Sequence, residues 1–229
     1  MKRISLTISI ILLLCCYASA QSPVDHGVVK DGVYINAGFG FSFKYPKDWV
    51  VHGEATDQRI RELGKEKIAE AGTPKASVEV AMNNTYQLLT VFRHPVGTPG
   101  IGFNPGILVL AEGVAHAPGI TNGKDYLLNV RAVVTKVGYQ PQLKEPVECR
   151  FADTQFFRDN YTADVNGMQM VQSHFATIKN GYALVFVFLS DDEKSLDEMT
   201  KSMETLDITP VRRGVTTIND SPPPRKPKP

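Results

Sequence analysis

The chain of 229 residues carries 25 basic and 24 acidic side chains, and 42% of its residues are hydrophobic. This near-neutral charge gives no electrostatic footprint for nucleic acid, and the length is enough for the core of one domain. Of the three cysteines, Cys15 and Cys16 lie near the amino terminus and Cys149 stands alone, which excludes an internal disulfide, a zinc finger and a paired redox motif beyond that terminus.

Residues 1–20 have the three parts of a secretory signal peptide. Lys2 and Arg3 give a positive start, residues 8–16 form an apolar core, and small residues precede the cleavage expected before Gln21. The apolar core is shorter than the roughly 20 residues of a membrane-spanning helix. We predict an exported chain, periplasmic or extracellular, with a net charge of −1 and no integral membrane segment after cleavage. A retained anchor and a lipid anchor at one of the two leader cysteines are the alternatives.

The polar residues 21–32 are predicted to form a flexible leader, followed by a single domain over residues 33–209. The first element of that domain is a strand, because large aromatic side chains occupy every second position, as expected for one buried face of a sheet. These alternating residues are Phe39, Phe41, Phe43 and Tyr45.

Three helices are predicted from apolar residues at helical spacing. The first covers residues 56–71. The second begins after a cap at Thr121 or Asn122 and ends at Gly138. The third begins with a capping box formed by Ser190 and Glu193. The apolar positions are Ile60, Leu63 and Ile68 in the first helix, Leu127, Val130, Val134 and Val137 in the second, and Leu196, Met199, Met203 and Leu206 in the third.

Five further strands are predicted, and the last three follow one another as a meander. Asn-Gly pairs at 166–167 and 180–181 favour the type I′ turns of tight hairpins. The final strand is apolar at every position, so both of its faces should be covered. We therefore expect an α/β (α+β) fold, an α/β/α sandwich whose sheet is mainly antiparallel and has helices on both faces. The strands cover residues 86–92, 107–114, 154–165, 168–179 and 182–189.

The motif FSFKYPKDW at residues 41–49, a helix before the middle, a late meander and a closing METLDI at residues 203–208 resemble the PsbP/Mog1-like fold group. This group includes exported bacterial proteins of the DcrB type, and the resemblance covers residues 33–208. It implies a protein that binds other proteins or assemblies rather than one that catalyses a reaction. The predicted export signal excludes the nuclear role of the Mog1 proteins, and no sequence feature indicates photosynthesis.

The chain shows no recognisable catalytic, metal or cofactor motif. The five histidines are scattered without an HExxH pair, the GxSxG elbow is missing, and the glycine-rich residues 97–106 lack the Lys-Ser/Thr pair of a phosphate loop. Three acids at 191–193 are explained by the start of a helix. We predict no catalytic residue, no metal ligand and no cofactor. The alternative is an enzyme with a dispersed site in which His174 activates the Cys149 thiol.

The loop at residues 94–106 places Ile101 and Phe103 at an exposed tip, which is a candidate contact with a partner. The alternative is that Phe103 folds back onto the sheet. Residues 210–229 form a basic, proline-rich and disordered tail, which either contacts a partner or stays solvated. We predict an exported, non-enzymatic binding or accessory protein whose partner is another protein or an envelope component. A carrier of a small apolar ligand is a further alternative.

Overall fold

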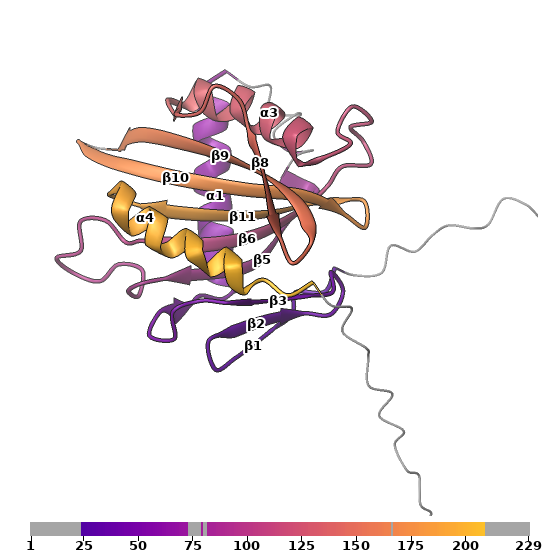
Figure 1. The fold of residues 1–229 in the computed structure, drawn as a ribbon. Coiled ribbons are helices and arrows are strands. Elements are labelled where there is room, and N and C mark those ends of the chain that lie inside the picture. Colours follow the sequence, from indigo (N-terminus) through magenta and orange to yellow (C-terminus); the bar gives the residue numbers. More distant parts are fainter. Residues whose placement is uncertain (1–23, 73–78, 80–81, 166, 209–229) are drawn as a thin grey trace, which may run out of the picture.

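The computed structural model describes residues 24–72, 79, 82–165 and 167–208. The predicted signal peptide at residues 1–20 and the predicted tail at residues 210–229 lie outside this part of the chain. In the described part, the strands form one sheet of three and one sheet of eight. Figure 1 shows α4 in front of the large sheet and α1 behind it.

The large sheet has the order β4-β5-β6-β11-β10-β9-β7, and β8 pairs with β9. All neighbouring strands are antiparallel, as predicted. The small sheet has the order β1-β2-β3. The strands are β1 (Val28–Lys30), β2 (Val33–Asn36), β3 (Phe41–Lys44), β4 (Val50–Val51), β5 (Thr85–Phe92), β6 (Gly106–Gly113), β7 (Gln140–Pro141), β8 (Val147–Phe151), β9 (Thr154–Val165), β10 (Met168–Lys179) and β11 (Tyr182–Ser190). The helices are α1 (Glu54–Glu70), α3 (Gly123–Val134) and α4 (Glu193–Thr200), with 3-10 turns η2 (Thr135–Val137) and η3 (Lys201–Thr205).

The predicted meander is confirmed by the pairing of β9, β10 and β11. Lys179 pairs with Tyr182 across Asn180 and Gly181, whose φ values of 53° and 80° are those of a type I′ turn. Asn166 of the other Asn-Gly link lies outside the described residues, but Met168 pairs with Val165 across it. Two-residue links therefore set the register of the central strands.

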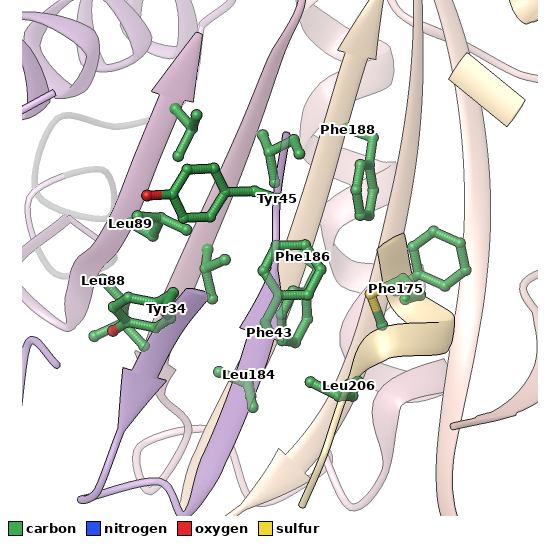
Figure 2. Packing of buried hydrophobic residues seen from close by; sticks show 14 of the residues in the cluster. Tyr34, Phe43, Tyr45, Leu88, Leu89, Phe175, Leu184, Phe186, Phe188 and Leu206 are labelled. Atoms are coloured by element: carbon green, nitrogen blue, oxygen red, sulfur yellow. The ribbon is translucent and has the colours of Figure 1, made fainter. Parts of the chain in front are cut away.

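One side of the large sheet, which we call the aromatic face, packs against the small sheet and against α4. Phe41 and Phe43 of β3 are fully buried and meet Phe186 of β11 with ring centroids 5.6 and 5.4 Å apart. Figure 2 shows Phe43 against Phe186. Phe39 and Tyr45 are also buried, which confirms the predicted aromatic face of this strand. The remaining cover comes from the apolar side of α4 and η3, namely Leu196, Met199, Met203 and Leu206.

The other side of the large sheet, the helix face, lies under α3 and α1. Leu127 of α3 packs there against Val185 of β11, and Ile60 of α1 joins the same cluster. At Gly123 the helix backbone approaches β10 so closely that an added Cβ would lie 2.1 Å from the carbonyl oxygen of Ala176. Helices therefore lie on both faces, as predicted, while the small sheet shares the aromatic face with α4.

One predicted helix start and one predicted helix end are confirmed, and a second predicted start is wrong. Asn122 caps α3, because its side chain accepts hydrogen bonds from the backbone of Lys124 and Asp125. Gly138 ends η2 with a φ of 97°. The capping box predicted at Ser190 and Glu193 is wrong. Ser190 is fully buried at the end of β11, and the cap of α4 is Asp192, whose carboxylate accepts from the Ser195 backbone.

Regular structure begins earlier than the predicted boundary at residue 33. Val28 pairs with Ile35, so β1 lies inside the stretch assigned to the leader. Asp25 explains this order, because its carboxylate accepts hydrogen bonds from the backbone of Gly27 and Gly38 at 2.8 and 2.7 Å. The Asp25 side chain thus holds this polar stretch, together with Val24, which packs against the core.

Candidate functional site

Cys149 lies on β8 with its side chain toward the aromatic face. It is half-buried and packs against the aromatic cluster. Burial raises the pKa of its thiol to about 11, although the charge of Arg158 opposes that rise. Because the thiolate is the nucleophile, a thiol of this kind is almost entirely protonated and unreactive near neutral pH.

His174 lies on the opposite side of the same sheet. On β10 it alternates with Phe175, which belongs to the aromatic cluster and lines a pocket with Cys149. Burial on the helix face lowers the pKa of His174 to about 4, and its Nε2 lies 2.8 Å from Oε1 of Gln172. The structure therefore does not bring the two candidate catalytic side chains together. It places them on different faces, each in an environment that favours its neutral form.

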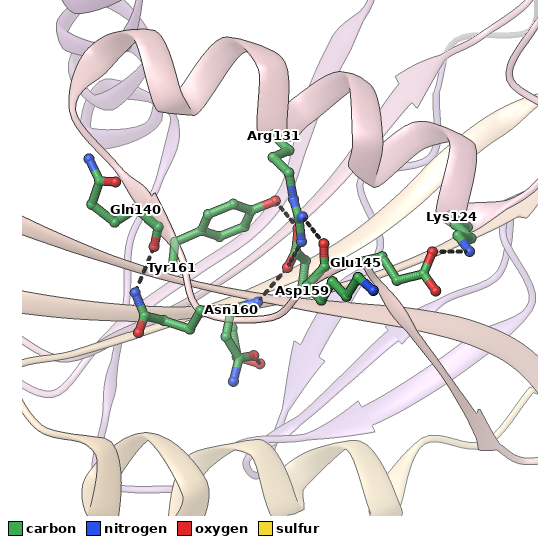
Figure 3. A network of polar contacts seen from close by, with 10 residues as sticks. Lys124, Arg131, Gln140, Glu145, Asp159, Asn160 and Tyr161 are labelled. Carbon is green, nitrogen blue, oxygen red and sulfur yellow. Dashed lines mark hydrogen bonds and ion pairs between the residues drawn. The ribbon is translucent and has the colours of Figure 1, made fainter.

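A buried ion pair stands next to His174 on the helix face (Figure 3). Asp159 of β9 is fully buried and receives Nε and Nη2 of Arg131 from α3 at 2.9 and 2.7 Å. The hydroxyl of Tyr161 donates to the same carboxylate at 2.6 Å, and the Asn160 backbone donates at 3.0 Å. The Tyr161 ring lies 4.9 Å from the His174 ring.

The groups of this network bond to one another and are not arranged to react with a substrate. Four donors converge on the two oxygens of Asp159, so little acceptor capacity is left for a substrate. Burial raises the pKa of Tyr161, which keeps its hydroxyl a donor. The arrangement fixes α3 to β9, because the two hydrogen bonds of a bidentate arginine–carboxylate pair define its geometry. The ion pair was not predicted, although the register of the β9–β10 hairpin places Asp159 opposite His174.

The loop between β5 and β6 carries both predicted contact residues. Ile101 is 38% exposed, whereas Phe103 is half-buried, so only the first stands free at the tip. Asn104 closes the base of the loop by accepting from the backbone N–H of His94 at 3.0 Å and donating to its carbonyl at 2.7 Å. The Asn104 side chain thus joins the two ends of the loop.

Two further apolar side chains are exposed at this end of the molecule. Val96 of the same loop is 45% exposed, and Met168 at the start of β10 is 38% exposed. A Cβ at Gly102 would lie 3.5 Å from Sδ of Met168, so the loop and the β9–β10 hairpin touch. We call Val96, Ile101 and Met168 the tip surface. Met168 was missed because it is distant in sequence.

A pocket of about 350 Å³ lies between the β8–β9 hairpin and the C-terminal helix segment, and we call it the hairpin pocket. Cys149, Phe151 and Phe175 form its apolar part. Arg158 and Lys201 are its cationic residues. The lining is completed by Val147, Glu148, Thr200 and Glu204.

A second pocket, of about 390 Å³, lies between α1 and β5 and is mainly polar. Asp57 lies in it, and burial raises the pKa of this carboxyl, although a 2.5 Å hydrogen bond from Thr90 opposes the rise. Nearby, Nε2 of His52 is buried without a hydrogen-bond partner in the structure.

Among the described residues, no group of three or more His, Cys, Asp or Glu side chains is arranged to hold a metal ion. No described helix is long and apolar enough to cross a membrane.

A scan against protein-family models finds no match, and no curated protein matches by sequence. Among solved structures, the chain is similar to LpqN of Mycobacterium tuberculosis, a protein involved in cell envelope biogenesis. The TM-score is 0.43 and the identity 13%, over 74% of this chain and 83% of LpqN. It is also similar to cyanobacterial PsbP from Synechocystis sp. PCC 6803, with a TM-score of 0.42 and 12% identity over 78% and 91% of the two chains.

A third similar structure is PA94 of Pseudomonas aeruginosa, a protein of unknown function, with a TM-score of 0.38 and 11% identity over 53% of this chain and 79% of that one. The PsbP structure agrees with the fold group that the sequence resembles. At these scores and identities the similarity concerns the arrangement of elements and carries no information about ligands or partners.

Proposed function

We propose that this chain is an exported, non-enzymatic binding protein that contacts another protein or an envelope component through the tip surface. Export rests on the signal peptide read from residues 1–20, with cleavage before Gln21. Binding rests on the exposed apolar residues of the loop and hairpin. The alternative hypothesis of an enzyme that uses Cys149 and His174 is not supported, because these residues lie on different faces of the sheet.

The observation that carries this proposal is the approach of the exposed Met168 to Gly102, the neighbour of the exposed Ile101 in a loop that also exposes Val96. A single exposed apolar side chain is ordinary on a protein surface, but neighbouring ones on different segments are typical of contact sites. Asn104 joins the two ends of the loop at its base, which limits the freedom of the loop and reduces the conformational entropy that is lost when a partner binds.

Photo-crosslinking in intact producing cells tests the contact. A photoreactive amino acid at Ile101 is expected to give a discrete adduct. The matched control is the same amino acid at Leu63, an apolar residue of α1 that is 52% exposed but isolated from the tip. Ile101→Asp combined with Met168→Asp should remove the adduct formed from position 96. Equal labelling from positions 63 and 101, or none from either, contradicts the proposal.

Two further measurements separate the parts of the proposal. Mass spectrometry of the exported protein is expected to find Gln21 as the first residue, and an intact leader on a cytoplasmic product contradicts export. Cys149→Ser and His174→Gln should leave the crosslink at position 101 unchanged. Loss of cellular function in these two variants, with the fold and the crosslink intact, would restore the enzyme reading.

A further inference from the structure

The hairpin pocket has an apolar wall that nothing in the described chain fills. Phe151 of β8 and Phe175 of β10 stand there with ring centroids 5.7 Å apart, and Cys149 lies in the same wall. Figure 2 shows Phe175 beside the C-terminal helix segment. The opposite side is formed by Thr200 and η3, so a ligand would lie between the hairpin and that segment.

A tight turn holds the β8–β9 hairpin beside the pocket. The turn between β8 and β9 is formed by Ala152 and Asp153, both with positive φ, at 45° and 60°. Such a two-residue turn matches the twist of antiparallel strands and leaves little freedom between them. Val147 pairs with Arg158 in this hairpin, which brings the guanidinium to the pocket beside the Cys149 thiol.

The lining holds two acids and two cations, but they do not pair with one another. Glu148 is engaged by Arg150 at 3.6 Å. Among the described residues, the side chains of Arg158 and Lys201 form no ion pair and no hydrogen bond, and Glu204 is the remaining acid. The half-buried Arg158 is the more telling of the two cations, because a planar guanidinium beside an apolar wall is suited to bind a carboxylate with two parallel hydrogen bonds.

We propose that the hairpin pocket binds a small anionic amphiphile, a carboxylate carried on an apolar body. The body lies against Phe151, Phe175 and Cys149, and the carboxylate meets Arg158 and Lys201. The volume of about 350 Å³ is at the lower end for ligand pockets, which limits the ligand to a short chain or a single ring. This site is separate from the tip surface. Ligand binding in the hairpin pocket goes beyond the proposed function, because it does not depend on partner contact at the tip surface.

Titration of the mature protein with octanoate, followed by backbone amide NMR, tests the site. We expect saturable shifts at residues 147–151 and 200–204. Octylamine, with the same chain and the opposite charge, is expected to bind at least about tenfold more weakly. Octanoate should also slow the reaction of Cys149 with a thiol reagent at alkaline pH, because the ligand covers the sulfur.

Variants assign the charge. Arg158→Gln should weaken octanoate binding about tenfold, the loss of one good charge-assisted contact. The matched control is Arg59→Gln, which removes the same charge from an exposed position on α1, away from the pocket, and should change affinity by less than about twofold. Glu204→Gln should strengthen binding. Lys201→Gln, at an exposed position, provides a second test should Arg158→Gln destabilise the fold.

Three results overturn the proposal. One is equal affinity for octanoate and octylamine. Another is equal weakening by Arg158→Gln and Arg59→Gln, which would indicate a general charge effect. The third is the absence of saturable shifts at the pocket up to about 10 mM octanoate, an affinity too weak for a ligand site.

Discussion

The two faces of the large sheet are covered by different means. The aromatic face is filled with rings, and Phe41, Phe43 and Phe186 leave no exposed surface. The helix face holds a smaller apolar cluster together with a buried ion pair between Arg131 and Asp159. One face thus depends on apolar burial, which is not directional, and the other on hydrogen bonds of fixed geometry.

This difference shows how one sheet can hold two kinds of cover. Apolar packing mainly determines how the small sheet and α4 lie on the aromatic face. The ion pair between Arg131 and Asp159 instead fixes α3 to β9. Stability on the aromatic face should therefore depend on side-chain volume and hardly on pH. Stability on the helix face should depend on charge and on pH.

The largest expected effect is on the aromatic face. Phe186→Ala removes a ring that meets Phe41, Phe43 and Phe156, and should lower the free energy of unfolding by about 4 kcal/mol. Denaturant unfolding at pH 7 and pH 5 should give the same loss at both. Leu63→Ala, at an exposed site, is the control and should change stability by less than about 0.5 kcal/mol. A loss that varies with pH would break the contrast between the faces.

On the helix face, Arg131→Met should lower the free energy of unfolding by about 3 kcal/mol, because it leaves the Asp159 carboxylate buried and unpaired. Lys124→Met is a matched control, since Lys124 and Glu145 lie at the same N–O distance of 2.7 Å but are partly or largely exposed (Figure 3). Its loss should stay below about 1 kcal/mol. Similar losses for both variants would show that burial of this pair has no special weight.

His174 makes the helix face sensitive to acid. Its pKa is lowered to about 4 in the folded chain from an ordinary value of 6.5, mainly by burial and against the opposing charge of Asp159. Between these values the unfolded chain binds more protons, so the free energy of unfolding should fall by roughly 3 kcal/mol as the pH falls from 6.5 to 4. His174→Gln should remove that part of the slope in denaturant titrations. An unchanged slope would contradict the assignment.

The smallest effect concerns the start of α4. Asp192→Ala removes the cap and should lower the free energy of unfolding by about 1 kcal/mol. Glu193→Ala, at the neighbouring acid, should lower it by only about 0.3 kcal/mol through the helix dipole. Thermal unfolding of the two variants measures the difference. If Glu193→Ala proved the more harmful, the capping box read from the sequence would be restored.

The parts of the fold that were predicted correctly rest on short-range patterns. Alternate aromatic residues from Phe39 to Tyr45 predict one buried face, and Asn180 with Gly181 predicts a turn whose geometry needs both residues. The small sheet was not foreseen, because strands of three or four residues carry too little pattern to reveal their partners. The Ser190 capping box was wrong because β11 continues through Ser190, so that the helix begins two residues later and Asp192 caps it by accepting from the Ser195 backbone.

The candidate sites were predictable only in part. Ile101 was placed at an exposed tip from glycine and proline content alone, whereas Met168 joins it only through the approach of two segments distant in sequence. Cys149 and His174 were plausible neighbours until strand alternation placed them on opposite faces. Arg131 reaches Asp159 from a separate helix, and no local pattern carries that information.

The pairing of Ser42 with Asp207 has a consequence for how the chain reaches its final form. Each backbone donates to the other, at 2.8 and 3.0 Å, so the edge of the small sheet is completed by a residue about 160 positions later in the chain, near the last of the described residues. During synthesis, the phenylalanines of β3 are made early but cannot be fully enclosed until residue 207 has emerged. The nascent chain must therefore expose an aggregation-prone aromatic segment for most of its synthesis. During that interval the segment can bind chaperones or aggregate.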